Sequence, residues 1–199
     1  MAPLIDLVNE QLDPRALSQI SQQLGIDEHQ TRQAVPAALT ALLGGLSHNA
    51  SQPQGAQQLA GALSRDHDGS ILDNLGGFLG GGAATGVGAS ILGHIFGRRQ
   101  PAVETTVGRS TGLDPATVSQ LLMLLAPIVL GALGRRQRQQ GLDPGGLAGV
   151  LGEERRQAEA SAPSGLGGLL GRVLDADGDG QIMDDVGGLL GGILGGGRR

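Results

Sequence analysis

Two stretches of the sequence, Leu24–Leu46 (LGIDEHQTRQAVPAALTALLGGL) and Thr111–Leu133 (TGLDPATVSQLLMLLAPIVLGAL), align with each other without a gap. In each, a glycine, an aliphatic residue and an aspartate precede a long, mostly apolar run. An aspartate in that place caps a helix by accepting a backbone N–H of its first turn. Because internal repetition indicates one structural unit used twice, the two stretches predict two long helices, each entered through the same turn.

Further helix starts are marked by an aspartate followed by a proline, at Asp13-Pro14, Asp114-Pro115 and Asp143-Pro144. Proline is favoured in the first turn of a helix, directly after such a cap. No segment alternates convincingly between apolar and polar residues with period two, which a half-buried strand would require. The predicted fold class is therefore all-α, with two tandem repeated helical modules (helix-turn-helix-like hairpins) and Gly-rich helices or tails.

A second shared element follows each long apolar run. Asp66–Gly76 reads DHDGSILDNLG and Asp177–Gly187 reads DGDGQIMDDVG, and the second copy is delayed by an insert at 152–174. The predicted organisation is a first helical module with a Gly-rich helix at 1–97, a linker at 98–108, and a second helical module at 109–199 with that insert and a Gly-rich C-terminal segment.

The segments Asp68–Leu75 (DGSILDNL) and Ile91–Gly97 (ILGHIFG) resemble the bacterial YidB-like family, a domain family of unknown function. The resemblance covers most of residues 1–97 and, more loosely, the second half. It implies a small helical fold and brings no reaction with it. The second copy departs from the family pattern, since Gly-Ser-Ile-Leu-Asp is replaced there by Gly-Gln-Ile-Met-Asp.

The acidic residues between Leu174 and Val186 have the spacing of an EF-hand calcium loop, in which alternate carboxylates converge on a hard cation and a glycine permits the turn. The last position of an EF-hand loop holds a glutamate that binds calcium through both carboxylate oxygens, and here that position is Val186. An earlier aspartate would have to supply the missing oxygen ligands, which requires a shorter loop. The alternative is a plain Asp-Gly turn that begins the next helix. The predicted calcium ligands are Asp175, Asp177, Asp179, Gln181, Asp184 and Asp185, and a second candidate with fewer ligands comprises Asp66, Asp68 and Asp73.

The composition excludes many enzyme classes. The chain has no Cys, Trp or Tyr, and all 14 of its basic residues are arginine. Without lysine there is no P-loop and no pyridoxal Schiff base, and without cysteine there is no thiol nucleophile or thiolate metal site. The four histidines all precede Gly108–Gly112, which fits the nucleophile-elbow pattern, so the required order of Ser, acid and His is impossible. We therefore expect a protein that is not an enzyme.

Glycine is concentrated in two runs that resemble helix faces. Residues 75–97 carry no Asp, Glu or Arg over the length of a membrane span, and 186–197 (VGGLLGGILGGG) place aliphatic residues on one stripe and glycines on the other. Each glycine costs about 1 kcal/mol of helix stability relative to alanine, so such helices need another backbone close by. That neighbour could be in the same molecule, in a second copy or in a membrane, and a disordered tail is the alternative for 186–197.

The net charge of –5 argues against nucleic acid as a partner, because phosphate binding needs a concentrated positive face. Only residues 98–140 are basic, with a sum of +4. Residues 16–39 resemble a DNA-binding helix-turn-helix, but the second helix offers one arginine before it becomes apolar.

Together these features predict a non-enzymatic, self-associating helical scaffold or interaction protein, a homo-oligomer joined through its Gly-rich helices and modulated by calcium. A membrane-associated or membrane-active protein with glycine-zipper-like helices is the alternative, and a DNA-binding helix-turn-helix protein is the third. The start of the chain, MAPLIDLVNEQLD, lacks the basic and apolar regions of a signal peptide, which favours a cytoplasmic or membrane-peripheral location.

Overall fold

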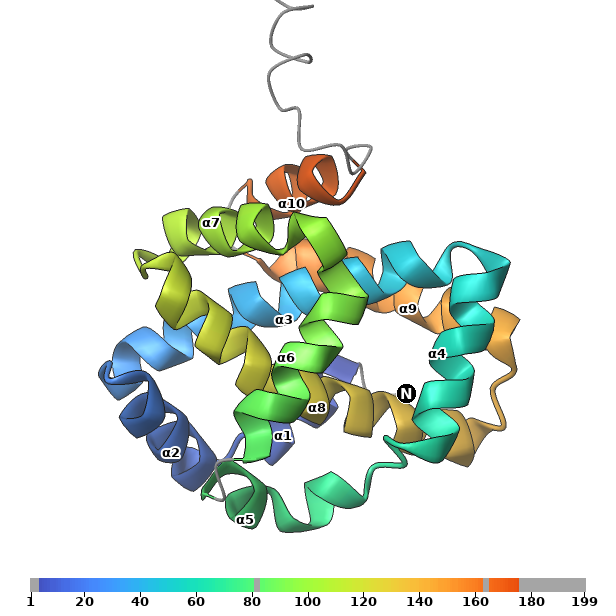
Figure 1. The fold of residues 1–199 in the computed structure, drawn as a ribbon, viewed down its shortest axis with the longest axis horizontal. Helices are drawn as coiled ribbons and strands as arrows, with labels where there is room; N and C mark the ends of the chain where they lie inside the picture. Colours follow the sequence, from blue (N-terminus) through green and yellow to red (C-terminus); the bar gives the residue numbers. More distant parts are fainter. Residues whose placement is uncertain (1–3, 81–82, 163–164, 176–199) are drawn as a thin grey trace, which may run out of the picture.

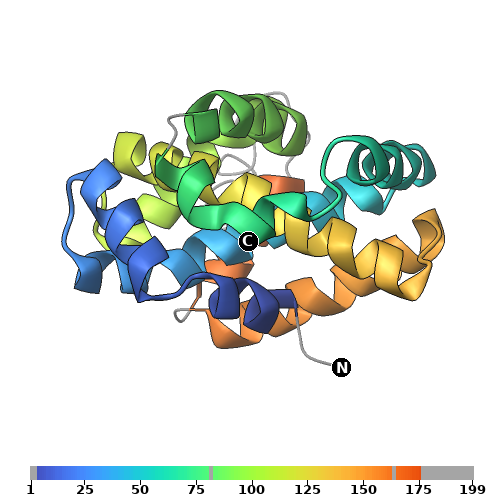
Figure 2. The same cartoon turned by 90° about the horizontal axis from the view of Figure 1, so that it is seen from below.

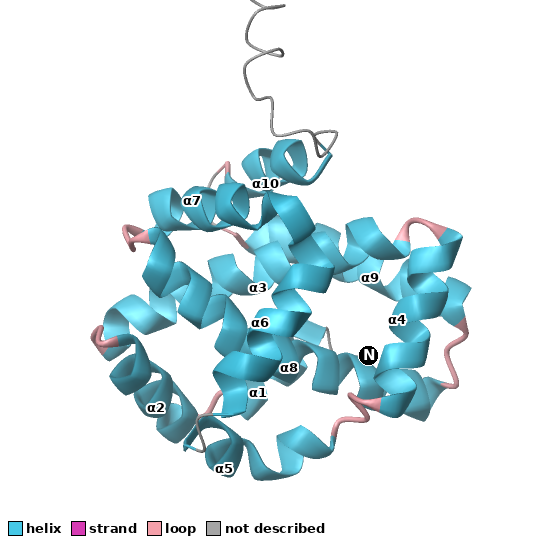
Figure 3. Ribbon diagram, viewed as in Figure 1, coloured by secondary structure: helices cyan, strands magenta, loops and turns pink. Residues whose placement is uncertain are grey.

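A computed structural model describes residues 4–80, 83–162 and 165–175, and nearly all of these residues are helical (Figure 3). No strand occurs in these three ranges. The α-helices are α1 (Leu4–Gln11), α2 (Pro14–Leu24), α3 (Glu28–Ala50), α4 (Pro53–Arg65), α5 (Leu75–Gly80), α6 (Ala83–Phe96), α7 (Gln100–Thr111), α8 (Pro115–Gln140), α9 (Pro144–Ser161) and α10 (Leu166–Asp175), with short 3-10 helices η1 (Ser70–Asn74) and η2 (Gly97–Arg99). The all-α prediction is confirmed.

The predicted helix starts are confirmed residue by residue. In each case an aspartate side chain accepts a backbone N–H from the first turn. The first four N–H groups of a helix have no acceptor within the helix, so such a side chain supplies one. The capping residues are Asp13 for α2, Asp27 for α3, Asp114 for α8 and Asp143 for α9. The helices α2, α7 and α8 end at glycines with a left-handed backbone, namely Gly25, Gly112 and Gly141.

The long helices α3 and α8 form the centre of the molecule. They contact each other, and α8 also packs along α6 while α3 packs along α9 (Figures 1 and 2). Their middle turns carry alanine, leucine and glycine and are buried almost without interruption. The buried side chains of both halves form one continuous core.

Two segments named in the sequence analysis are helical. Residues 98–108, the predicted linker, form η2 and most of α7, and Val103 and Val107 lie four residues apart on one helix face and are fully buried. Within the uncharged stretch 75–97, the described residues form α5, α6 and the first residue of η2.

One helix in the described ranges, α8, is long and apolar enough to cross a membrane. Of its most apolar window, 72% is buried inside the protein. Most of this helix therefore lies in the core, and the long helix predicted over Thr111–Leu133 is confirmed. Proline at 127 lies inside this helix and is itself buried.

Candidate functional site

The element shared by the two halves of the sequence lies, in its first copy, across the last turns of α8. Helix α4 ends at Arg65, and the chain turns at Gly69, whose φ of 91° favours glycine. The 3-10 helix η1 then contacts α8 and leads directly into α5. In Figure 1 this segment runs along the lower edge of the molecule, between α4 and α5.

Two glycines on α8 make the close approach possible. A Cβ atom at Gly131 would stand 2.6 Å from Cγ2 of Ile71, and one at Gly134 would collide with the carbonyl oxygen of His67. Real Cβ contacts are longer than this, so any larger residue at these positions would push the segment away. We call the segment 66–76 the first loop, and Gly131, Gly134, Arg135 and Arg138 its seat on α8.

Arginines hold the first loop on this seat. Arg135 donates to the carbonyl oxygen of Gly69 at 3.1 Å and to the carboxylate of Asp73 at 2.5 Å. Arg138 donates to the carboxylate of Asp68 at 3.2 Å and also to its carbonyl oxygen. Because guanidinium groups present several donors in a fixed plane, each arginine can bind a backbone oxygen and a carboxylate together.

The titratable groups of the first loop respond to this setting. The pKa of Asp68 is lowered, first by hydrogen bonds from the Ser70 hydroxyl and backbone N–H and then by Arg138. The pKa of His67 is lowered by burial, which the nearby Asp66 carboxylate opposes. The loop is therefore built for a charged aspartate and a neutral histidine.

A third arginine of α8 forms a buried ion pair nearby. Arg136 Nη1 lies 2.5 Å from Glu154 Oε1, and the two side chains are 13% and 3% exposed. The other carboxylate oxygen of Glu154 accepts the backbone N–H of Leu4 at 2.7 Å. One glutamate of α9 thus joins α8 to α1.

Two residues of the second calcium candidate have arginine partners: Asp68 pairs with Arg138 and Asp73 pairs with Arg135. The third, Asp66, directly follows the last residue of α4. Within the described ranges, no three His, Asp or Glu side chains are grouped so that they could hold a metal ion. Of the first candidate, Asp175 is the last residue of α10, and Asp177, Asp179, Gln181, Asp184 and Asp185 lie outside the described residues. Calcium binding stays a prediction.

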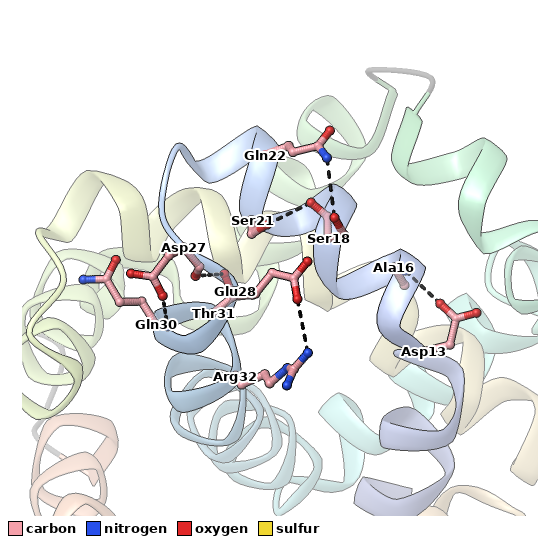
Figure 4. A network of polar contacts seen from close by, with 10 residues as sticks. All are labelled: Asp13, Ala16, Ser18, Ser21, Gln22, Asp27, Glu28, Gln30, Thr31 and Arg32. Carbon is pink, nitrogen blue, oxygen red and sulfur yellow. Dashed lines mark hydrogen bonds and ion pairs between the residues drawn. The ribbon is translucent and has the colours of Figure 1, made fainter.

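The helix-turn-helix resemblance corresponds to α2 and α3, joined through Gly25. At the start of α3, Asp27 accepts the backbone N–H of Gln30, and Glu28 pairs with Arg32 at 3.1 Å (Figure 4). Thr31 is buried and donates to the carbonyl oxygen of Asp27. The arginine that this surface offers is thus already engaged within its own helix.

Two grooves open on the surface near the end of α3. One, of about 180 Å³, is bordered by α3, α9 and α10, and Arg155 and Glu159 pair within it at 3.1 Å. The other is lined by Asn49 of α3 together with residues 94–99, which include Arg98 and Arg99. The first groove is also lined by His48, and the second by His94.

The outer face of α6 carries small residues. Gly86 and Gly93 are exposed, and a Cβ atom added at either one would meet nothing within 4 Å. Val87 beside them is 43% exposed. The opposite face is tightly packed, because a Cβ atom at Gly88 would collide with the Met123 carbonyl of α8. The glycine run at 186–197 lies outside the described residues.

These features define a small all-helical protein whose long central helix receives an acidic loop through glycines and arginines. The chain belongs to a bacterial protein family of unknown function, DUF937, whose family model matches residues 6–136. This agrees with the resemblance to YidB-like proteins and with the helical fold that it implied. The matched region includes the first loop and, of its seat, Gly131, Gly134 and Arg135. No curated protein and no solved structure matches the chain.

Sequence reasoning missed the arginines of α8 and Glu154 as site residues. In the sequence analysis the arginines enter only through the positive charge of residues 98–140. A usable signal was present, because three arginines within four positions follow two glycines at one helix end, while the first loop carries three aspartates.

Proposed function

We propose that this chain is a non-enzymatic, self-associating helical scaffold, and that the outer face of α6 joins two copies. The observation that carries the proposal is the open space over Gly86 and Gly93 beside the exposed Val87. Glycines cost helix stability, and among the residues that the structure describes nothing stands within 4 Å of a Cβ atom placed at Gly86 or Gly93.

The spacing of the small residues suits a second helix. Gly86, Ser90 and Gly93 follow each other by four and three positions, so they lie on one face of α6. All three are exposed. A face whose largest side chain at these three positions is that of serine lets another backbone approach closely, and Val87 supplies apolar area at its edge. Figure 1 draws α6 in front of α8, with its outer side uncovered by other helices.

We further propose that the fold is a tandem repeat, in which α2, α3 and α4 correspond to α7, α8 and α9. The matching caps Asp27 and Asp114 and the matching left-handed glycines Gly25 and Gly112 support this. The packing also supports it, because each long helix contacts the third helix of the other proposed unit: α3 lies against α9, and α8 lies against α4. The two proposed units would thus be interlocked within one core.

Calcium is proposed as a modulator through Asp175–Asp185, on the strength of the carboxylate spacing. Binding would neutralise the aspartates that precede the glycine run at 186–197. Because those aspartates repel one another when no cation is present, calcium would favour an ordered start to that run. Self-association would then be stronger with calcium than in chelator.

The experiment is the mass in solution by light scattering over a range of concentrations, for the full chain and for Gly93→Gln. We expect the wild type to exceed the mass of one chain and Gly93→Gln to return to it, because the longer side chain holds the second helix away. The matched control is Gly149→Gln, on the exposed face of α9, where a Cβ atom also meets nothing within 4 Å. Both changes improve helix propensity by roughly 0.5–1 kcal/mol, so only the site differs.

A wild type that stays at the mass of one chain at all concentrations would overturn the scaffold proposal. If the wild type has the same mass in chelator and in calcium, calcium modulation is rejected and the proposal of self-association is unaffected. Partition of the chain into liposomes would favour the membrane alternative, and binding to DNA that weakens steeply with salt would favour the third.

A further inference from the structure

The seat of the first loop has a counterpart on the other long helix. The alignment of α3 with α8, at an offset of 87 positions, maps the seat residues Gly131, Gly134, Arg135 and Arg138 onto Gly44, Ser47, His48 and Ser51, in that order. These four residues of α3 line the groove of about 180 Å³. The place that the first loop fills on α8 is thus an open groove on α3.

The chain reaches this groove just before the second copy of the loop begins. Leu170 and Leu174 of α10 line it, and a Cβ atom at Gly44 would stand 3.0 Å from Cδ1 of Leu174. Arg99 fixes this end of α10 by donating to the carbonyl oxygen of Leu174. The next residue is Asp175, and the second loop, 177–187, follows at once.

The distance along the groove suits the length of chain available. Gly44 and Ser51, the residue that caps the end of α3, are seven positions apart, which is about 10 Å along a helix. Helix α10 ends at Asp175, and three residues of extended chain, from Asp175 to Gly178, would span up to about 10–11 Å. The Asp-Gly turn of the second loop can therefore lie over Ser47 and Ser51.

In the alignment of the two loops, Asp179 and Asp184 take the places of Asp68 and Asp73, the two carboxylates that arginines bind in the first copy. On the α3 side the cations come from other elements. Arg155 lines the groove and pairs there with Glu159, so a docked aspartate would have to share or replace that carboxylate. Arg98 and Arg99 line the neighbouring groove with Asn49 and add two further cations on this side of the molecule.

We propose that the second loop, Asp177–Gly187, docks in the groove on α3, as the first loop docks on α8. The groove is thus an internal docking surface for an acidic segment of the same chain. The inference rests on the proposed tandem repeat and is independent of self-association through α6.

The test uses the natural absence of cysteine. Ser47→Cys with Gly178→Cys places thiols at the counterparts of Gly134 and His67, and the rate of disulfide formation within the chain is measured in chelator. The comparison is the same pair with Asp179→Arg and Asp184→Arg, which leaves the tether length unchanged. The matched control reverses Arg198 and Arg199 to glutamate, beyond the loop. Hydrogen exchange of residues 177–187 in the wild type is the second measurement.

We expect the aspartate reversals to slow the disulfide about tenfold, because two favourable charge contacts become repulsive. The control reversals should leave the rate unchanged, and backbone amides of 177–187 should exchange more slowly than in the free peptide. Equal rates in all three variants, with peptide-like exchange, would overturn the proposal, since a merely tethered chain behaves in this way. A covalent dimer that forms faster at higher concentration would also overturn it and would assign the segment to a second copy. Mass in solution is a separate readout, so failure here does not decide the scaffold proposal.

Discussion

The last two turns of α8 hold arginines in two very different settings. Arg136 points into the protein and pairs with Glu154, and both side chains are almost fully buried. Arg138, two positions on, is 54% exposed and pairs with Asp68 on the first loop. One helix end thus offers a buried and a surface ion pair that can be compared directly.

The difference lies in what surrounds the charges. Water screens the Arg138 pair, so its net contribution to stability is small. The Arg136 pair has lost its water, and its attraction mainly offsets that loss. Glu154 also accepts the N–H of Leu4, so removal of its carboxylate would leave a buried cation and a buried donor without their partner. The buried pair therefore fixes the relative position of α1, α8 and α9, whereas the surface pair adjusts the loop.

The largest effect is expected for Glu154→Leu. Loss of one member of a buried pair should lower the free energy of unfolding by about 3–5 kcal/mol, because the Arg136 charge would remain buried and unpaired. Urea unfolding followed by circular dichroism measures this. The double variant Arg136→Met with Glu154→Leu is the control, and it should recover most of the loss. A double variant as unstable as the single one would show that shape, and not charge, decides this site.

A much smaller effect is expected at the surface pair. Arg138→Gln should lower the free energy of unfolding by about 0.2–1 kcal/mol, and the difference from wild type should shrink in high salt. A double-mutant cycle with Asp68→Asn isolates the pair, although the carbonyl oxygen of Asp68 would still need a donor. A loss above 2 kcal/mol that salt does not change would mean that this pair, too, behaves as buried.

The sequence predicted what depends on neighbouring residues. The caps Asp13, Asp27, Asp114 and Asp143 act within three positions of themselves, so their residue types alone marked the helix starts. The apolar run Thr111–Leu133 also predicted the long helix α8. Residues 98–108, the predicted linker, are helical, and the valines at 103 and 107 carried the signal for a helix there.

The candidate site could not be predicted in the same way, because it depends on contacts across the chain. Arg135 binds Gly69 from 66 positions away, and Glu154 binds Leu4 from 150. The aspartates of the first loop predicted a cation by their spacing, but the structure gives Asp68 and Asp73 arginine partners. A carboxylate pattern indicates a need for positive charge, and only the fold decides whether a metal ion or a guanidinium meets that need.

The smallest expected effect is on how the free energy of unfolding depends on pH at the first loop, where the pKa of His67 is set by burial and that of Asp68 by hydrogen bonds and charge. Burial lowers the pKa of His67 below its ordinary value of 6.5, so the unfolded chain binds a proton that the folded chain resists. Stability is therefore full above pH 6.5 and falls as the pH drops from there towards the lowered pKa. Asp68 acts at lower pH, because its depressed pKa adds stability that is lost only as the pH falls from the ordinary value of 3.8 through the lowered one. We expect His67→Gln to reduce the loss of unfolding free energy just below pH 6.5. The loss below pH 3.8 that Asp68 causes should remain. Urea unfolding between pH 7.5 and pH 3 measures both. The same decline in both proteins would mean that the His67 ring gains a proton in the folded loop as easily as in the unfolded chain.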